Sequence, residues 1–322
     1  MTGQVESLGG VAYGHLLPDA RPYAVLDDET RIKRVRAERW IDHREASLVL
    51  SLLQESLEQP LRERMENILL LGESGMGKTM ILRKFERINA RPFDTIAGIE
   101  RRSVVVVRMP HEPTEAAFVD QLLVALRAPR SGPVGRQRLQ EMRDTAFRVL
   151  REVRARVLVI DEINSVLVGT PRQQRLFLQL LRFLSNELAI ALVCAGVPEA
   201  RHALLSDSQL RSRFTDVELP LWQADEELQR FVNLLVAGMP LRRPSPIDAP
   251  KVRRLLAERT GGVTLNVSKA IERATIAAIR TGKESIDLAA LEDETVWRGI
   301  TVQRLPLGSR GGRGARTTVP SL

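Results

Sequence analysis

The stretch NILLLGESGMGKT, residues 67–79, decides the fold. It joins a run of four aliphatic residues to a glycine-rich loop of the form G-x-x-x-x-G-K-T, and a helical pattern follows directly. A loop of this form between a strand and a helix presents successive backbone N–H groups to the phosphates of a nucleotide. We therefore predict that a nucleotide is bound by Gly72, Glu73, Ser74, Gly75, Met76, Gly77, Lys78 and Thr79.

A second acidic motif completes the predicted nucleotide site. The segment VLVIDEI, residues 157–163, is a short apolar strand that ends in two carboxylates. We expect Lys78 to contact the β- and γ-phosphates and Thr79 to bind Mg²⁺ directly, with Asp161 holding the ion through water. Glu162 is then the residue that polarises the attacking water, so the pair of acids predicts hydrolysis as well as binding.

Short apolar runs alternate with helical patterns along the first two thirds of the chain. Four of them cover residues 67–71, 103–108, 157–160 and 189–195, and a fifth candidate covers residues 216–219. Strands without polar alternation, joined by helical crossovers, are typical of a parallel sheet buried on both faces. The sequence therefore predicts an α/β fold in which helices flank a parallel five-stranded sheet.

Two other classes of nucleotide-binding protein are excluded by missing motifs. No asparagine starts the Asn-Lys-x-Asp pattern by which GTPases read guanine, and the transporter signature Leu-Ser-Gly-Gly-Gln is absent. ATP with Mg²⁺ is the expected cofactor. The interval between the two nucleotide motifs leaves room for one more strand and two helices, as in the additional-strand class of P-loop proteins.

The remaining segments predict the domain organisation. Residues 1–26 are expected to form an extended N-terminal arm and residues 27–60 two N-terminal helices. Residues 61–221 form the ATPase domain, and residues 222–303, which lack strand signals, form a small all-α domain. Residues 304–322 contain four arginines and no acidic residue, and we interpret them as a disordered basic tail.

Composition limits the partners and the compartment. The chain of 322 residues carries a net charge of +8, and half of this charge lies in the basic tail. Nucleic acid binding therefore has to be sought in local patches. Cys194 is the only cysteine, which excludes an internal disulfide and a cysteine-based zinc site. No apolar run approaches the about 20 residues of a membrane span, so a soluble cytoplasmic protein is expected.

At this point several segments resemble AAA+ ATPases, and more narrowly the TniB family of transposon-encoded ATPases, relatives of TnsC. The resemblance extends from about Arg31 to about Asp293. It rests on RAERWIDHREA (36–46), RMENILLLGESGMGKT (64–79), VVVVRMPHEPTEAAF (104–118), VLVIDEINSVLVG (157–169), RLFLQLLRFLSNELAIALVCAGVPEA (175–200) and DSQLRSRF (207–214). It implies that the helical domain is the lid of an AAA+ ATPase.

The resemblance also implies a function. Proteins of this family are ATP-dependent regulators that oligomerise on double-stranded DNA, as a ring or a helical filament, and recruit or activate a DDE transposase. A TniQ-type targeting protein is a further implied partner. The ATP site is shared between subunits, and an arginine from one subunit reaches the γ-phosphate in the next. Arg213 matches this position, with Arg211 as the alternative.

The same resemblance suggests where DNA binds and where this chain departs from its relatives. The implied DNA-contacting residues follow the second strand and are Arg127, Arg130, Arg136 and Arg138. The fourth strand, LVCAGV, offers only Cys194 where a polar residue usually orients the water. Asn266 occupies the lid position that often holds a nucleotide-binding arginine. Slow or partner-stimulated hydrolysis is therefore expected.

Two alternatives stay open at the level of sequence. A helicase loader of the same superfamily would bind a helicase in place of a transposase. A non-hydrolysing adaptor would use bound nucleotide only to stabilise its fold.

Overall fold

A computed structural model describes residues 13–62, 64–91, 100–129, 136–204 and 208–300. Its centre is a five-stranded parallel sheet with the order β2-β3-β4-β1-β5. The strands are β1 (Asn67–Leu71), β2 (Val104–Arg108), β3 (Val157–Asp161), β4 (Ala191–Gly196) and β5 (Phe214–Glu218). All five lie within a few residues of the predicted apolar runs.

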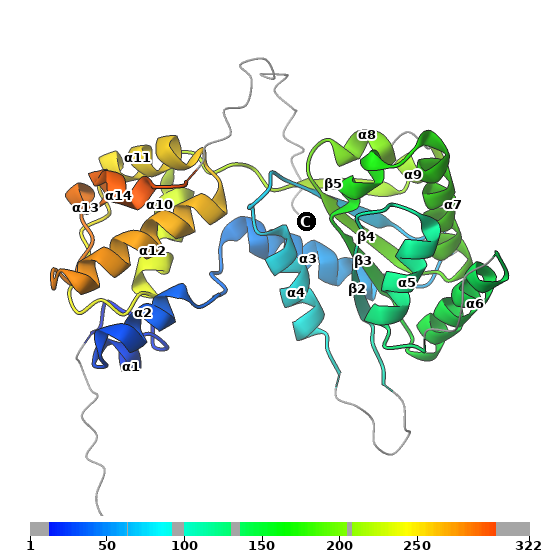
Figure 1. The fold of residues 1–322 in the computed structure, drawn as a ribbon, viewed down its shortest axis with the longest axis horizontal. Coiled ribbons are helices and arrows are strands. Elements are labelled where there is room, and N and C mark those ends of the chain that lie inside the picture. The colour runs from blue at the N-terminus through cyan, green and yellow to red at the C-terminus, as the bar shows by residue number, and fades with distance from the viewer. Residues whose placement is uncertain (1–12, 63, 92–99, 130–135, 205–207, 301–322) are drawn as a thin grey trace, which may run out of the picture.

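The sheet is held by burial on both faces. Every residue of β1, β3 and β4 is buried, whereas β5 at the edge is largely exposed. On one face α3 (Arg44–Glu58) and α4 (Lys78–Ile88) pack against the sheet. The other face is covered by α5 (Glu115–Ala125), α6 (Arg136–Glu152) and α7 (Pro171–Glu187) (Figure 1). Alternate side chains of each strand supply the two cores, as expected when both faces are covered.

Short elements connect the later strands. A 3₁₀ helix, η1 (Ile163–Val168), follows β3, while α8 (Ala200–Leu204) and α9 (Ser208–Arg211) lie between β4 and β5. Because β1 and β4 are paired from Ile68 with Val193 to Leu71 with Gly196, the loops that follow both strands meet at one edge of the sheet. The loop after β3 reaches the same edge, since β3 pairs in parallel with β4.

A small helical domain follows β5. Its helices are α10 (Glu226–Ala237), α11 (Pro250–Thr260), α12 (Thr264–Arg280), α13 (Leu288–Glu292) and α14 (Glu294–Trp297). Asp293 has an extended backbone and its side chain caps α14, so α13 and α14 are separate helices. The buried positions of α10 and α12 recur at helical spacing and meet each other in the core of the domain.

The N-terminal residues differ from the predicted extended arm. Within the described part, α1 (Arg21–Ala24) buries Ala20 and Ala24 with Leu16. The backbone N–H of Leu17 donates to the carbonyl of Ala237 in α10 at 2.8 Å. Residues 13–26 therefore form a packed segment. Their apolar side chains are too few to predict burial from periodicity alone.

The two helices predicted over residues 27–60 belong to different parts of the molecule. Helix α2 (Asp28–Arg36) lies against α12 of the helical domain, whereas α3 packs on the parallel sheet (Figure 1). Residues 37–43 connect the two helices and pass beside the loop that follows β1. Among the described residues, no helix is sufficiently long and apolar to cross a membrane.

Candidate functional site

The loop between β1 and α4 has the backbone of a phosphate-binding loop. Gly75 and Gly77 both have positive φ, and Gly77 is the N-cap of α4, where it offers no capping side chain. The amide groups at the start of α4 therefore face the position of a bound anion. A Cβ on Gly75 would lie 3.0 Å from Val263 and 3.1 Å from Leu265, so only glycine lets the loop approach the helical domain this closely.

The structure brings the two predicted motifs together. Thr79 donates a hydrogen bond from Oγ1 to Oδ2 of Asp161 at 2.7 Å, although 82 residues separate them in the sequence. Lys78 is buried beside them, and its ammonium donates to the carbonyls of Gly72 and Glu73 at 2.6 and 3.0 Å. Burial lowers the pKa of Lys78, against the opposing effect of the nearby carboxylates. A hydroxyl and a carboxylate in contact fit the oxygen donors that Mg²⁺ prefers.

Glu162 has an unusual backbone conformation at the end of β3. Its φ of 59° and ψ of 39° lie in the left-handed region, which a residue with a long side chain rarely adopts. Such strain occurs most often at functional positions. The Glu162 carboxylate lies 4.0 Å from the guanidinium of Arg108, the last residue of β2, and it lines the same cavity as Lys78 and Thr79.

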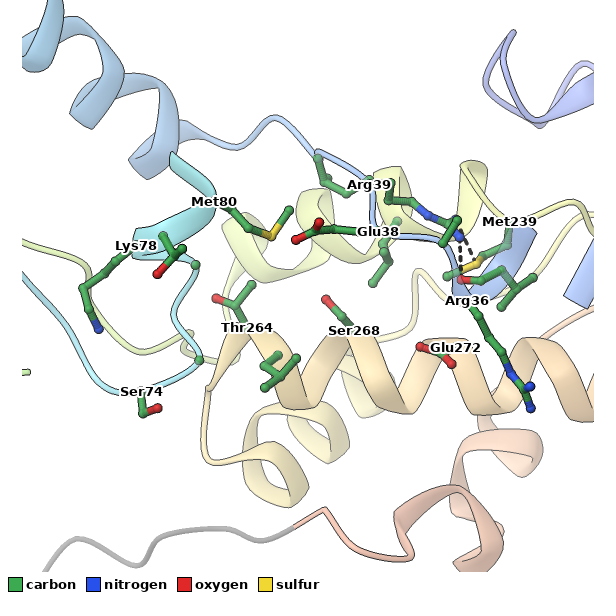
Figure 2. Close-up of a pocket in the computed structure, with 18 of the residues that line it drawn as sticks. Arg36, Glu38, Arg39, Ser74, Lys78, Met80, Met239, Thr264, Ser268 and Glu272 are labelled. Atoms are coloured by element: carbon green, nitrogen blue, oxygen red, sulfur yellow. Dashed lines mark hydrogen bonds between the residues drawn. The ribbon is translucent and has the colours of Figure 1, made fainter. Parts of the chain in front are cut away.

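The cavity has a volume of about 370 Å³ and is bounded by three parts of the chain. The phosphate-binding loop and Glu162 form one end. The linker between α2 and α3 forms a second wall and α12 a third, with apolar side chains from α2, the linker and α10 (Figure 2). The apolar residues are Val35, Ile41, Leu235 and Met239. A polar end for phosphates next to an apolar space suits a nucleotide.

The linker was not identified as part of the site from the sequence. Residues 36–39 and Ile41 line the cavity, although their sequence contains no phosphate-binding or catalytic motif. The available signal was the segment Arg36 to Ala46, which carried the family resemblance without an assigned role. Its place in the site follows only from the packing of α2 on the helical domain and of α3 on the sheet.

Asn266 is not among the residues that line the cavity. Its side-chain amide donates to the carbonyl of Thr260 at 3.0 Å, at the end of α11. The face of α12 turned to the cavity carries Thr264, Ser268 and Glu272 instead. These residues follow one another at intervals of four, the spacing that aligns side chains along one face of a helix.

Cys194 is unsuited to orient water. It is fully buried in the core formed with α5, α6 and α7, and burial raises the pKa of its thiol. No residue of β4 lines the cavity. Val197, just beyond the end of the strand, does line it, but its side chain is apolar.

Arg213 lies at the other end of the sheet from the phosphate-binding loop. It directly precedes β5, its carbonyl accepts from the backbone N–H of Asn67, and its side chain bonds to Asn186 at the end of α7. The loop starts beyond the opposite end of β1, about 16 Å away along a strand of this length. Arg211, at the end of α9, lies on the same side. Neither residue lines the cavity of its own chain.

The four arginines expected to contact DNA are only partly described. Arg127 has a positive φ after α5, and its exposed guanidinium lies 3.5 Å from Glu100. Arg136 and Arg138 fall in the first turn of α6, where the backbone alone is described. Arg130 lies outside the described residues, as does the basic tail.

Solved structures with a similar fold were found by comparison. The Aeropyrum pernix ORC2 protein in its ADPNP-ADP complexes is 16% identical, with a TM-score of 0.58 over 84% of this chain and 73% of that one. Cdc6p from Pyrobaculum aerophilum is 20% identical, with a TM-score of 0.55 over 81% and 68%. The Aeropyrum pernix ORC1 protein in complex with DNA is 20% identical, with a TM-score of 0.52 over 87% and 67%.

The fold and the site together define the class of protein. A parallel five-stranded sheet, a phosphate-binding loop in contact with an acidic strand end, and a C-terminal helical domain make this an AAA+ P-loop NTPase, as the sequence predicted. The family follows from a sequence model described as Bacterial TniB protein, which matches residues 31–224. The chain belongs to the TniB family. The comparison with curated proteins gave no match.

Proposed function

We propose that this protein is an ATPase that regulates DNA transposition by assembling on double-stranded DNA and recruiting or activating a DDE transposase. TniB membership and the AAA+ fold support an ATPase with a DNA-associated role. The observation that best supports nucleotide binding is the 2.7 Å hydrogen bond between Thr79 and Asp161. It lies beside Glu162, at one end of a cavity of about 370 Å³.

The residues of the site suit ATP with Mg²⁺. The loop from Gly72 to Thr79 holds the phosphates through its backbone N–H groups and the Lys78 ammonium. Thr79 and Asp161 hold the metal ion, which neutralises charge on the phosphates when bound. Glu162 accepts a hydrogen bond from the attacking water and draws its proton away from the oxygen. Glu162 lines the cavity beside Lys78 and Thr79, which is the position this role requires.

A shared site between subunits is part of the proposal. Arg213 is too distant to serve the cavity of its own chain, but an arginine at the opposite edge of the sheet is well placed to reach a neighbouring copy. Arginines supplied in this way to other NTPases accelerate hydrolysis by about 10³–10⁵-fold. Cys194 is fully buried and cannot orient the attacking water. This supports hydrolysis that is slow until DNA or a transposase is present.

DNA binding is proposed through arginines near the ends of α5 and α6 and through the basic tail. Arg127 is exposed on a loop, where an arginine contacts phosphate oxygens without reading bases. Such contacts suit a protein that binds DNA of many sequences. Binding of this kind weakens steeply with salt because each neutralised phosphate releases counterions.

The experiment compares two variants of the full chain for assembly on DNA and for ATP turnover. Lys78→Ala is expected to lose ATP binding and ATP-dependent assembly, because the phosphates lose their buried cation. Glu162→Gln keeps the phosphate contacts, so it should assemble on DNA while turnover falls by about 10²-fold or more. Electron microscopy with double-stranded DNA reports assembly, and phosphate release reports turnover.

The same measurements separate the rival functions. Equal turnover in the wild type and in Glu162→Gln would contradict the proposed hydrolysis and favour a non-hydrolysing adaptor. Stimulation by a replicative helicase, with no response to a DDE transposase, would favour a helicase loader. Lys283→Ala is a surface control, because its pair with Asp287 lies in the helical domain and Lys283 does not line the cavity.

A further inference from the structure

Two acidic side chains line the cavity beyond the phosphate-binding loop. Glu38 enters from the linker and Glu272 from α12, with the hydroxyl of Ser268 between Thr264 and Glu272 (Figure 2). The carboxylate of Glu38 is directed along the cavity towards Met80 and Lys78. A glutamate carboxylate accepts hydrogen bonds through both of its oxygens, so these two side chains present hydrogen-bond acceptors to the cavity.

The two arginines that border the cavity form no described hydrogen bond with these carboxylates, and Arg39 interacts with Glu272 only through space. The Arg39 guanidinium donates to the carbonyls of Gly238, Arg34 and Val35 at 2.6–2.9 Å, which uses its donors on the backbone. Arg36 extends past α12, away from Lys78, with its guanidinium outside the space between the linker and α12 (Figure 2). No ion pair joins Glu38 or Glu272 to another described residue within the 4 Å limit of such a pair.

Carboxylates in this position would repel a triphosphate unless the ligand offers hydrogen-bond donors to them. Beyond its phosphates, an adenosine nucleotide has donors in two places, the ribose hydroxyls and the 6-amino group of the base. Thr264 and Glu272 are eight residues apart on α12, or about 12 Å along the helix axis. A nucleotide whose phosphates lie at Lys78 therefore extends past Thr264 and Ser268 and brings its base nearest to Glu272.

We propose that Glu38 accepts hydrogen bonds from the ribose hydroxyls and that Glu272 accepts one from the 6-amino group, so that these two residues select adenosine ribonucleotides. The inference rests on the proposed ATP site and adds its specificity. The apolar side chains of Val35, Ile41, Leu235 and Met239 supply contact area without discrimination. Each carboxylate then distinguishes ligands by one donor group.

The test measures the affinity of the full chain for three nucleotides by calorimetry: ATP, 2′-deoxy-ATP, and purine riboside triphosphate, which lacks the 6-amino group. The wild type should prefer ATP to each analogue by about tenfold, the effect of one hydrogen bond to an ionised group. Glu38→Met should abolish the preference over 2′-deoxy-ATP alone. Glu272→Met should abolish the preference over purine riboside triphosphate alone.

Ratios of affinities are the decisive readout. Removing a carboxylate also relieves repulsion of the triphosphate, but this raises affinity for all three nucleotides equally and cancels in the ratio. Glu258→Met, on the exposed face of α11, is the matched control and should leave both ratios unchanged.

Two results would overturn the inference. One is a wild type that binds the three nucleotides equally, and the other is a pair of variants that keep both wild-type ratios. If Lys78→Ala still abolishes binding in either case, the ATP site stands and only the assignment of Glu38 and Glu272 fails. Unchanged binding in Lys78→Ala would instead contradict the proposed function.

Discussion

At the scale of single residues, Arg31 shows how a charge can be buried in an interior. Its side chain is fully buried, and it donates to both carboxylate oxygens of Glu284, to the carbonyl of Pro240 and to Asp28. The pKa of Arg31 is raised: burial alone would lower it, but the bonds to Glu284 outweigh that effect. Arg242 adds a second cation 3.5 Å from Glu284. This network joins α2 to the helical domain.

Arg31→Met is predicted to destabilise the protein by about 3–5 kcal/mol, because it leaves the Glu284 carboxylate with less compensation in a buried position. Denaturant unfolding of the isolated chain measures the free energy. Lys33→Met is the matched control, since Lys33 is exposed on the same helix and its pair with Glu29 is worth well under about 1 kcal/mol. Equal effects of the two substitutions would contradict the importance of the buried network.

Glu284 predicts a pH dependence of stability. Burial raises the pKa of this carboxyl, but hydrogen bonds from Arg31 and from the backbone of Arg242 prevail and hold the pKa below its ordinary value. A lowered pKa in the folded state stabilises the fold above the unfolded value of about 4.3. That stabilisation is lost as the pH falls through the lower folded value. Thermal unfolding between pH 6 and 3 should show a smaller loss in Glu284→Gln than in the wild type.

At the scale of elements, the junction between the ATPase sheet and the helical domain depends on one turn. Gly262 has a φ of 70°, and a Cβ there would lie 2.4 Å from the carbonyl oxygen of Trp222. The Trp222 backbone N–H donates to Gly262, and its indole donates to Thr264 at the start of α12. The start of α12 in turn binds the phosphate-binding loop through the N–H of Leu265 and the carbonyl of Gly75, at 3.0 Å.

Gly262→Ala is therefore predicted to weaken both stability and ATP affinity. Gly282→Ala is the control, because Gly282 has the same φ of 70° with nothing within 4 Å of the added Cβ. The control should cost only the left-handed backbone penalty of about 1–2 kcal/mol. A larger loss in Gly262→Ala, measured by denaturant unfolding and by nucleotide titration, reports the clash with Trp222. Equal losses of stability and affinity in the two variants would show that the turn at Gly262 adjusts to the added Cβ without displacing α12.

At the scale of the whole molecule, the proposed site is completed by a second copy of the chain. Arg213 lies at the edge of the sheet opposite to Glu162, so the proposed mechanism needs a second copy. Arg213→Ala should lower DNA-dependent turnover by about 10³-fold and leave ATP affinity unchanged, since it removes a contact made to the neighbouring site.

Mixing variants tests the shared site. Glu162→Gln retains Arg213, and Arg213→Ala retains Glu162, so their mixed assembly contains some complete sites. Turnover should reappear on mixing, although each variant alone is nearly inactive. Arg211→Ala serves as the comparison for the alternative arginine. If turnover does not recover in assemblies that contain both variants, the proposal that Arg213 acts at the site of the neighbouring subunit is contradicted.

The sequence by itself determined the sheet and the chemistry of the phosphate end. The aliphatic runs have to be buried on both faces, and the glycine pattern from Gly72 to Gly77 allows few backbone conformations, so local chemistry was enough to predict both. It did not determine that residues 13–36 belong with the helical domain or that the linker after α2 forms a wall of the cavity. Nor did it determine that Ser268 and Glu272 face the cavity in place of Asn266. Arg31 and Glu284 are 253 residues apart in the chain. Only the tertiary structure decided these features, because such contacts depend on how separate elements pack and leave no periodic signal in the sequence around them.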